Sequence, residues 1–414
     1  MLVTLRSHSK VSDYSLLIFA VTKFHQHLIA DLVSVDACRV KSCNEYEYEF
    51  IQRIIKEISS IKSNQMQLPI AKYPVGVEPQ AEAIESLLDM ESKGVCMVGI
   101  YGLGGVGKTT LSIAVYNRIV DRFEGSCFLE NIREKSKTDV GITQLQETLL
   151  FKILQGRNDK VTSVREGITM IKERLHSKKV LLILDDVDQS KEIENLPGDC
   201  NWFALGSKVI ITTRDKEVLD LGRDPQIRTY EVNKLTPCEA HVLFNVHAFG
   251  KTEPKQEYSS LAEQIISSAD GLPLALKIMG SNLYDKSIDE WVCASEKYKK
   301  IPHEKILDKL KISYYGLGEV EKDIFLDIAC FFKGFNKDKV VNILDACKLY
   351  PNLGIKKLID KCLITVDVYG ILCMHDLLQQ MGRKIVQQES KELENRSRIW
   401  CHEDAYKLLI ENMV

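Results

Sequence analysis

In the middle of the chain, short segments that are apolar throughout alternate with longer segments whose apolar residues recur at helical spacing. The apolar segments span residues 95–100, 126–130, 180–184 and 208–212, and helices are predicted over 109–120 and 143–154. Strands that are apolar on both faces and separated by helices are typical of a parallel sheet covered by helices on both sides. The pattern therefore predicts an α/β subdomain over residues 73–235.

The strand pattern largely ends after residue 235, and helical periodicity takes over. Helices are predicted over residues 238–249, 258–268, 273–283, 306–314, 322–332, 339–346 and 377–388. One short extended pair, 363–366 and 371–374, flanks a turn that ends in Gly370 and predicts a hairpin. We therefore expect a helical subdomain over 236–308 and a winged-helix subdomain over 309–414.

The N-terminal part of the chain has a different pattern. Residues 1–44 carry no motif, and we leave them unassigned. Residues 45–72 are interpreted as an amphipathic linker helix, because isoleucines recur at helical spacing up to about residue 62. An extended stretch containing Pro69 and Pro74 then enters the α/β subdomain.

Charge and composition exclude several classes of protein. The 55 Lys and Arg residues nearly balance the 58 Asp and Glu residues, so a nucleic-acid partner is not expected. We expect no membrane association, because no segment approaches the roughly 20 apolar residues that a spanning helix needs. The 12 cysteines form no CxxC pair and no zinc-type spacing. We interpret them as reduced, buried residues of a cytoplasmic protein, with a nuclear location also open.

A glycine-rich segment between the first strand and the following helix has the phosphate-loop pattern. Its glycines allow successive backbone N–H groups to face phosphate oxygens at a helix N-terminus. Lys108 is expected to reach the β- and γ-phosphates and Thr109 to bind Mg²⁺. A glycine-rich turn without a ligand is the alternative, which the strand and helix on either side disfavour. The predicted nucleotide contacts here are Gly102, Gly104, Gly105, Val106, Gly107, Lys108, Thr109 and Thr110.

Acidic and basic residues follow two of the other predicted strands. Asp185 and Asp186 end the strand at 180–184, where Asp185 is expected to bind Mg²⁺ and Asp186 to orient water. Arg214 follows the strand at 208–212 and is expected to sense the γ-phosphate, with a surface salt bridge as the alternative. Together with Lys108, these three residues form the predicted catalytic set. No Asn-Lys-x-Asp motif reads a guanine base, so adenine is the preferred base.

With these motifs in order, the sequence resembles the NB-ARC switch of plant intracellular immune receptors, within the STAND class of P-loop NTPases. The resemblance covers about residues 72–414 and extends to residues 123–133, to Gly271-Leu272-Pro273-Leu274 and to Met374-His375-Asp376. It implies a P-loop NTPase sheet followed by a helical ARC1 and a winged-helix ARC2 subdomain. It also implies that Pro273 lies near the adenine and that His375 contacts the β-phosphate of ADP. We add Val75 to the nucleotide-binding residues.

Asp188 and residues 325–332 resemble the subclass that carries an N-terminal Toll/interleukin-receptor-like domain. Residues 1–44 do not show that domain's sequence, and no run of leucine-rich repeats occurs. We therefore expect a nucleotide switch without its usual output and sensor modules, and carry over no activity of the missing domain.

The resemblance implies an ADP/ATP-binding conformational switch in plant defence signalling, reset by slow Mg²⁺-dependent ATP hydrolysis. The alternative is a truncated nucleotide-binding adaptor or regulator with negligible ATPase activity that acts through partner binding, so the sequence leaves open whether the chain is an enzyme. Other immune-receptor or signalling proteins are the expected partners, with self-association in the ATP-bound state. A DNA-binding regulator and a metabolic kinase are less favoured, because neither a basic terminal patch nor an acceptor-site signal accompanies the motifs.

Overall fold

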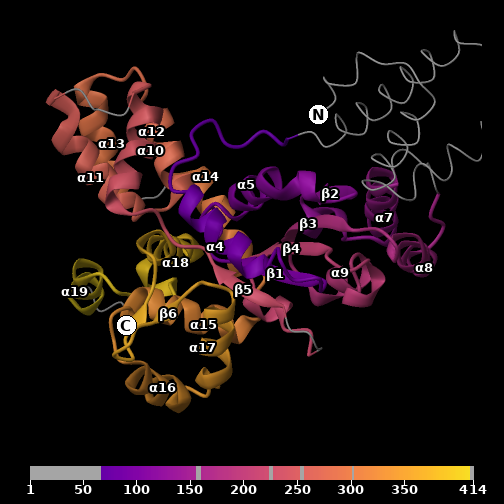
Figure 1. The fold of residues 1–414 in the computed structure, drawn as a ribbon. Helices are drawn as coiled ribbons and strands as arrows, with labels where there is room; N and C mark the ends of the chain where they lie inside the picture. The colour runs from indigo at the N-terminus through magenta and orange to yellow at the C-terminus, as the bar shows by residue number, and fades with distance from the viewer. Residues whose placement is uncertain (1–66, 155–159, 223–226, 252–255, 301–302, 411–414) are drawn as a thin grey trace, which may run out of the picture. The chain divides into compact units, whose positions relative to one another are not determined.

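The computed structural model describes residues 67–154, 160–222, 227–251, 256–300 and 303–410 (Figure 1). The chain divides into two units, residues 1–66 and 67–414, and only the second contains described residues. Residues 1–44, to which the sequence assigns no structure, lie outside the described residues. The amphipathic helix that is predicted to end near residue 62 lies outside them as well. Residues 67–77 contain neither helix nor strand.

A five-stranded parallel sheet forms the first part of the described structure. Its strands are β1 (Cys96–Tyr101), β2 (Gly125–Leu129), β3 (Val180–Val187), β4 (Lys208–Thr213) and β5 (Arg228–Glu231), in the order β2-β3-β4-β1-β5. Four strands follow the apolar segments of the sequence. The edge strand β5 is missed by that analysis because its residues are polar and mostly exposed. The predicted α/β parallel sheet is confirmed.

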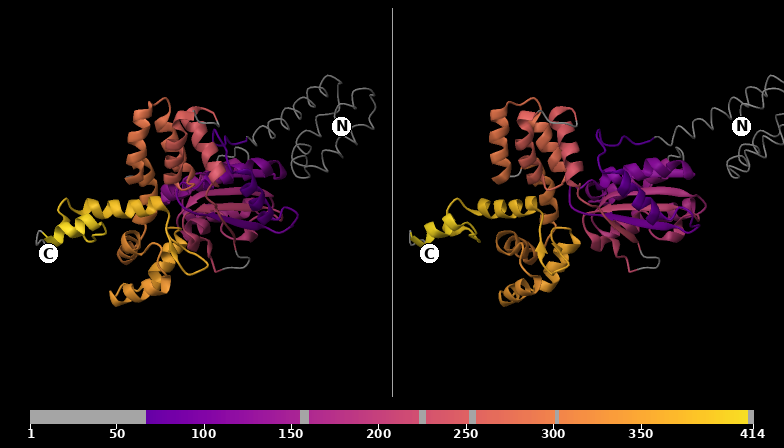
Figure 2. Two further views of the ribbon diagram at one scale, coloured as in Figure 1. Left: turned by 90° about the vertical axis from the view of Figure 1, so that its left-hand side faces the viewer. Right: turned by 60° about the vertical axis from the view of Figure 1, so that its left-hand side comes forward.

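Helices cover both faces of the sheet (Figure 2). Alternate strand residues enter different cores, with Ile183 packing among helices on one face and Leu182 among helices on the other. The helices of the first face are α4 (Glu78–Leu88) and α5 (Lys108–Ile119). Those of the second face are α6 (Ile132–Lys135), α7 (Asp139–Ile153), α8 (Val164–Leu175) and α9 (Ser190–Asn195).

Four helices lying alongside one another form the second part (Figure 2). They are α10 (Pro237–Phe249), α11 (Ser259–Ala269), α12 (Pro273–Leu283) and α13 (Ile288–Lys300). A capping box between Thr236 and Glu239 starts α10, where the sequence also places a proline at the first helical position. Trp291 of α13 stacks on Phe249 with ring centroids 5.2 Å apart, and its indole N–H donates to the carbonyl of Leu283 (3.2 Å).

The third part contains helices and one small hairpin. Its elements are α14 (Glu304–Tyr315), α15 (Glu319–Asp327), a π-helical turn at Ile328–Phe332, α16 (Lys337–Ala346), α17 (Pro351–Asp360), β6 (Thr365–Val366), β7 (Leu372–Cys373), α18 (Asp376–Glu389) and α19 (His402–Ile410). The turn between β6 and β7 is held by Asp367, whose side chain accepts the N–H groups of Tyr369 (2.9 Å) and Ile371 (2.8 Å). The predicted hairpin is confirmed.

Short 3-10 turns complete the described elements. They are Val120–Arg122, Cys200–Trp202, η4 (Lys216–Leu219), Gln256–Tyr258 and Leu393–Asn395. Of these, η4 matters below because it follows β4 directly. No helix among the described residues combines the length and the apolar character that crossing a membrane requires.

The expectation that the cysteines are buried is wrong for most of those described. All ten described cysteines are free thiols, but only Cys127 and Cys330 are buried. Cys238, Cys293 and Cys347 are exposed: Cys238 lies in the first turn of α10, Cys347 directly follows α16, and Cys293 lies at a solvent-facing position of α13. Burial raises the pKa of both Cys127 and Cys330 to about 12, so these two thiols act as small apolar side chains.

Replacing Trp291 by alanine tests the role of the aromatic cluster in the helical part. Trp291 is only 1% exposed, and removing it leaves a cavity and an unpaired carbonyl. We expect the free energy of unfolding in urea to fall by about 3–5 kcal/mol. Tyr284→Ala is the control, because Tyr284 is 59% exposed. Equal losses for both variants would contradict the assigned core.

Candidate nucleotide-binding site

The glycine-rich loop joins the end of β1 to the start of α5. Three of its residues, Gly102, Gly105 and Gly107, have positive φ angles of 152°, 85° and 109°, which residues with a Cβ rarely adopt. A Cβ on Gly107 would meet no atom within 4 Å. The Leu111 N–H donates to the Gly107 carbonyl (3.0 Å) as the first helical hydrogen bond of α5. The backbone N–H groups just before Leu111 therefore have no acceptor within the helix. This geometry suits an anion at the helix N-terminus.

Lys108 is folded onto the loop that precedes it. Its Nζ donates to the carbonyls of Gly102 (2.7 Å) and Leu103 (3.0 Å), and the side chain is buried. Burial, together with the positive charge of Arg214, lowers the pKa of Lys108 to about 8. The ammonium group lacks a carboxylate partner in its own hydrogen bonds, and a phosphate at the loop would supply the missing negative charge.

Thr109, at the start of α5, meets the first acid of β3. Its hydroxyl donates to the two carboxylate oxygens of Asp185 (2.9 and 3.1 Å), and Thr212 of β4 donates to the same carboxylate (2.7 Å). Asp185 is buried, and this burial raises its pKa despite the two hydroxyl donors. A cation here would favour the ionised carboxylate.

Mg²⁺ fits this pair in the way that Mg²⁺ usually binds to nucleotide sites. The described residues contain no group of three or more His, Cys, Asp or Glu side chains able to hold a metal ion. Mg²⁺ is commonly held by one or two protein oxygens together with phosphates and water. Thr109 and Asp185 are the residues that would provide those oxygens. Thr110, which is also a predicted nucleotide contact, follows Thr109 in the first turn of α5.

Asp186 faces different partners from Asp185, although the two are adjacent. It has a left-handed backbone conformation, with φ 60°, and its N–H donates to the Thr212 hydroxyl (2.9 Å). Its carboxylate pairs with Arg133 Nη2 (2.8 Å) and with Arg214 Nε (3.2 Å). Two guanidinium groups therefore occupy the carboxylate that was predicted to orient water.

Arg214 lies beside the phosphate loop. A Cβ on Gly104 would fall 2.9 Å from Arg214 Nη1, which shows how closely the guanidinium approaches the loop. The same Nη1 donates to the carbonyl of Lys309 in α14 (2.9 Å). The half-buried side chain of Arg214 thus lies between the loop, Asp186 and the third part of the structure. It does form an ion pair, with Asp186, but at a contact between parts of the structure and not on an open surface.

Sequence reasoning gave no role to Arg133 or Thr212, which complete this group. Arg133 lies at the end of the segment 123–133, and Thr212 lies inside a predicted strand. Their contacts with the acids depend on β4 lying next to β3 and on α6 lying against β3. Strand order is not visible in the local sequence, so no signal in the sequence could have placed these residues.

The segment Gly271-Leu272-Pro273-Leu274 contacts the phosphate loop from the helical part. Leu274 N–H donates to the Gly105 carbonyl (3.2 Å), and a Cβ on Gly105 would come within 2.7 Å of Leu274 Cβ. Only glycine allows this approach. Pro273 occupies the first position of α12, and Val75 precedes Gly76, whose backbone packs against Leu235.

His375 approaches the phosphate loop from the third part. It caps α18, with Nδ1 accepting the Leu377 N–H (3.1 Å), so the neutral ring carries its proton on Nε2. Nε2 is 3.4 Å from Asp270 Oδ2 and has no well-formed hydrogen bond among the described residues. Burial and the positive charge of Lys234 lower the pKa of His375 to about 4, against the opposing effect of the Asp270 carboxylate. Burial outweighs the carboxylate, so the ring is neutral at pH 7.

A cavity of about 250 Å³ separates the phosphate loop from His375. His375 lines this cavity, and its Nε2–H lies 3.4 Å from the Asp270 carboxylate without a well-formed hydrogen bond, so it can donate to an anionic ligand there. Of the predicted nucleotide-binding residues, Gly102, Val106 and His375 line this cavity. The others do not, so the structure does not bring them to the same cavity as His375: Val75, Gly104, Gly105, Gly107, Lys108, Thr109, Thr110 and Pro273. The lining includes Gly102, Leu103, Val106, Val232, Lys234, Leu272, Cys362, Met374 and His375.

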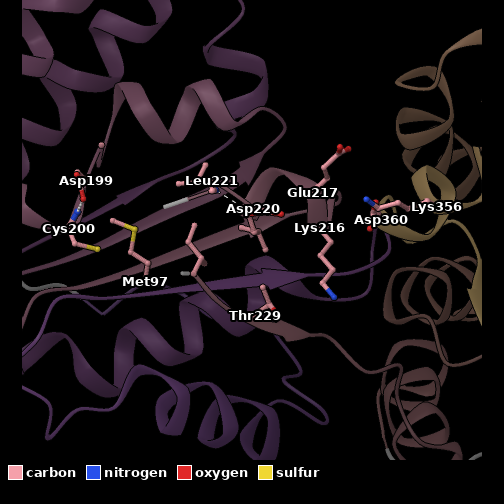
Figure 3. Close-up of a pocket in the computed structure, with 14 residues that line it drawn as sticks. Met97, Asp199, Cys200, Lys216, Glu217, Asp220, Leu221, Thr229, Lys356 and Asp360 are labelled. Carbon is pink, nitrogen blue, oxygen red and sulfur yellow. Dashed lines mark hydrogen bonds between the residues drawn. The ribbon is translucent and has the colours of Figure 1, made fainter. Parts of the chain in front are cut away.

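Asp376, the last residue of the Met374-His375-Asp376 motif, points elsewhere. Its carboxylate pairs with Lys333, which also donates to Gln379 (3.2 Å). Among the described residues, Asp376 therefore joins the π-helical region to α18 and is absent from the lining of the cavity. A further cavity of about 310 Å³ lies away from the loop and contains none of the predicted site residues (Figure 3).

Comparison with known families assigns two segments. The NB-ARC domain family matches residues 77–254, and the winged-helix domain of Roq1-like disease resistance proteins matches residues 318–390.

Relatives cover the same region of the chain. Disease resistance protein RUN1 of Vitis rotundifolia is 46% identical over 79% of this chain and 24% of its own length. TMV resistance protein N of Nicotiana glutinosa is 39% identical over 87% of this chain and 31% of its own length. The chain therefore spans about a quarter to a third of these relatives.

Among solved structures, the Walker-type ATPase PABY2304 of Pyrococcus abyssi aligns with a TM-score of 0.50 at 14% identity. The alignment covers 77% of this chain and 99% of that one. At this identity the likeness concerns the fold alone, which is that of a P-loop NTPase.

The pKa of His375 predicts a pH dependence of stability. The folded protein binds this proton near pH 4 and the unfolded chain near pH 6.5, so the unfolded state binds more protons in between. The contribution of the neutral His375 to the free energy of unfolding is complete above about pH 6.5 and is lost progressively as the pH falls toward about 4. His375→Asn keeps a cap on α18 and removes the titration.

Urea unfolding at two pH values measures this effect. Relative to His375→Asn, the wild-type protein should lose about 2 kcal/mol of unfolding free energy between about pH 7 and about pH 5. Both proteins contain the same carboxylates, so the difference isolates the imidazole. Parallel pH profiles for the two proteins would show that His375 is not buried in its neutral form.

Proposed function

Because residues 77–254 belong to the NB-ARC domain family and residues 318–390 to the Roq1-like winged-helix domains, we propose that the chain is an ADP/ATP-binding conformational switch in plant defence signalling. The observation that carries this proposal is the cavity between the phosphate loop and His375. One ligand in that cavity would contact two parts of the chain at once. Its binding free energy would then depend on how those parts are arranged.

ADP suits the arrangement described above. The loop amides and Lys108 would bind the phosphates, and the Nε2–H of His375 would donate to a phosphate oxygen. Such a bond would satisfy the one buried donor of the imidazole that lacks a partner. The family resemblance implies that the adenine would lie near Pro273, which, like Val75, lies outside the lining of the cavity that contains His375.

A third phosphate would change the contacts of Arg214. This residue already lies against Gly104 and holds both Asp186 and the Lys309 carbonyl. A γ-phosphate competes for the same guanidinium, so ATP would weaken the contact between the sheet and α14. Nucleotides that differ by one phosphate would thereby favour different arrangements of the parts.

Slow hydrolysis is consistent with the state of the acids. Bound Mg²⁺ would neutralise phosphate charge during transfer, held by Thr109 and Asp185. Asp186 can orient water only when its carboxylate is released from Arg133 and Arg214. That requirement supports a low rate of turnover and also keeps open the second candidate, a nucleotide-binding adaptor with negligible ATPase activity.

The cellular assignments are part of the same proposal. Relatives named as disease resistance proteins support a role in defence signalling. The proposed location is the cytoplasm, with the nucleus as a second location. Partners would be other immune-receptor or signalling proteins, and release of α14 on ATP binding would free a surface for self-association.

Lys108→Ala tests the nucleotide site. The substitution removes the buried cation of the phosphate loop, and we expect ADP binding measured by titration calorimetry to weaken by at least about 100-fold, or nearly 3 kcal/mol. Lys172→Ala is the control, because Lys172 is an exposed lysine on α8. Unchanged ADP affinity of Lys108→Ala would refute the site.

Phosphate release distinguishes the two candidate functions. The wild-type chain with ATP and Mg²⁺ should release phosphate slowly, at a rate that Asp185→Asn lowers by at least about tenfold because the metal ligand is lost. If ADP binds normally but the wild-type rate equals that of Asp185→Asn, the adaptor is the correct description and the self-resetting switch is not.

A further inference from the structure

A buried ion-pair group joins the end of β4 to α17. Asp215 Oδ2 lies 2.8 Å from Lys361 Nζ and 3.2 Å from Lys357 Nζ, and Lys357 also pairs with Glu217 of η4. Asp215 is 3% exposed and Lys361 is 8% exposed. These residues are separated by more than a hundred positions in sequence, and they link the sheet to the third part of the structure.

Asp215 is held rigidly on the side of the sheet. Its Oδ1 accepts the N–H of Glu217 (3.1 Å), which caps η4, and its own N–H donates to the Thr213 hydroxyl (3.1 Å). The carboxylate therefore cannot follow α17 if that helix moves away. Removing one member of a buried pair leaves an uncompensated charge in the arrangement seen here, so substituting either partner disfavours that arrangement.

A cavity lies beside this contact. The cavity of about 310 Å³ is lined by Lys216 and Glu217 from η4 and by Lys356 and Asp360 from α17, and on the sheet side also by Met97, Leu219 and Ile227. Figure 3 shows the four charged side chains between the sheet and α17. The ion-pair group is thus a direct contact between α17 and the segment after β4 at a place where a cavity separates neighbouring parts of the two elements.

The ion-pair group is also continuous with the nucleotide site. Thr212 binds Asp185, Arg214 binds Asp186 and lies against Gly104, and Asp215 binds Lys361. Arg214, which contacts the nucleotide site, and Asp215, which contacts Lys361, are therefore adjacent in the chain. In the other direction, α17 is followed directly by the hairpin that leads to Met374 and His375.

We propose that Asp215 and Lys361, supported by Lys357, form a latch that regulates nucleotide exchange by holding α17 and the following hairpin on the sheet. This inference rests on the proposed function for its consequence, the rate of ADP release, but its structural claim stands separately. With the latch closed, His375 covers the cavity. With the latch broken, the open arrangement is more populated and ADP leaves faster.

Three variants of the full chain test the latch. Asp215→Asn removes the charge and retains an oxygen for the Glu217 N–H, while Lys361→Met retains most of the aliphatic stem. The double variant completes a double-mutant cycle. Lys322→Met is the matched control, because Lys322 forms a local pair with Glu319 on α15 (2.8 Å).

Two measurements are made on each variant. Hydrogen exchange of the α17 amides (Pro351–Asp360) reports separation from the sheet without any nucleotide. Stopped-flow dissociation of the fluorescent analogue mant-ADP reports opening of the site. We expect Asp215→Asn and Lys361→Met each to speed both processes by about tenfold, with the double variant no faster than the faster single one, and Lys322→Met to behave as wild type.

The outcomes separate the latch from the nucleotide site. Unchanged α17 exchange in both single variants overturns the latch, as do additive effects in the double variant. Faster α17 exchange with unchanged mant-ADP dissociation overturns its control of nucleotide exchange. If the wild-type chain fails to bind mant-ADP, the proposed function fails, and the exchange data still decide whether the ion-pair group holds α17.

Discussion

The carboxyl end of β4 is the point on which the arrangement of the described structure depends. Thr212 donates to Asp185, the proposed metal ligand, and Thr213 pairs with Tyr101 at the end of β1. The next two residues, Arg214 and Asp215, form ion pairs with the second acid and with α17 and the residue that follows it. Parallel strands bring their carboxyl ends to one edge, so a single short segment can contact ligands and distant helices together. β4 lies between β3 and β1, and that central position allows this convergence.

Electrostatics at this edge explains why a nucleotide would act as a switch. Lys108 is buried without a carboxylate in its hydrogen bonds, His375 is neutral and retains an unused donor, and Asp186 is occupied by two arginines. The first two groups therefore have hydrogen-bonding or charge capacity that the protein itself does not use, and the arginines on Asp186 could pair with another anion instead. A polyphosphate would satisfy the first two groups and compete for the arginines, so ligand binding and domain contacts share the same side chains.

The sequence predicts much of this structure because several signals are local. The apolar runs locate four strands, the glycines and Lys108 locate the phosphate loop, and Asp367 with Gly370 locates the hairpin turn. The polar edge strand β5 lacks such a signal, and three cysteines predicted to be buried are exposed. The pairings of Arg133 with Asp186 and of Lys361 with Asp215 also escape prediction, because they depend on which strands and helices become neighbours in the fold.

The most direct test of the central claim is the identity of the nucleotide that remains bound when the full chain is purified without added nucleotide. The protein is denatured and the released nucleotide is identified and quantified by chromatography. Our account predicts ADP at close to one molecule per chain, because the loop, Lys108 and His375 would enclose it. A guanine nucleotide, or a chain that retains no nucleotide and binds none when ADP is added, would contradict the account.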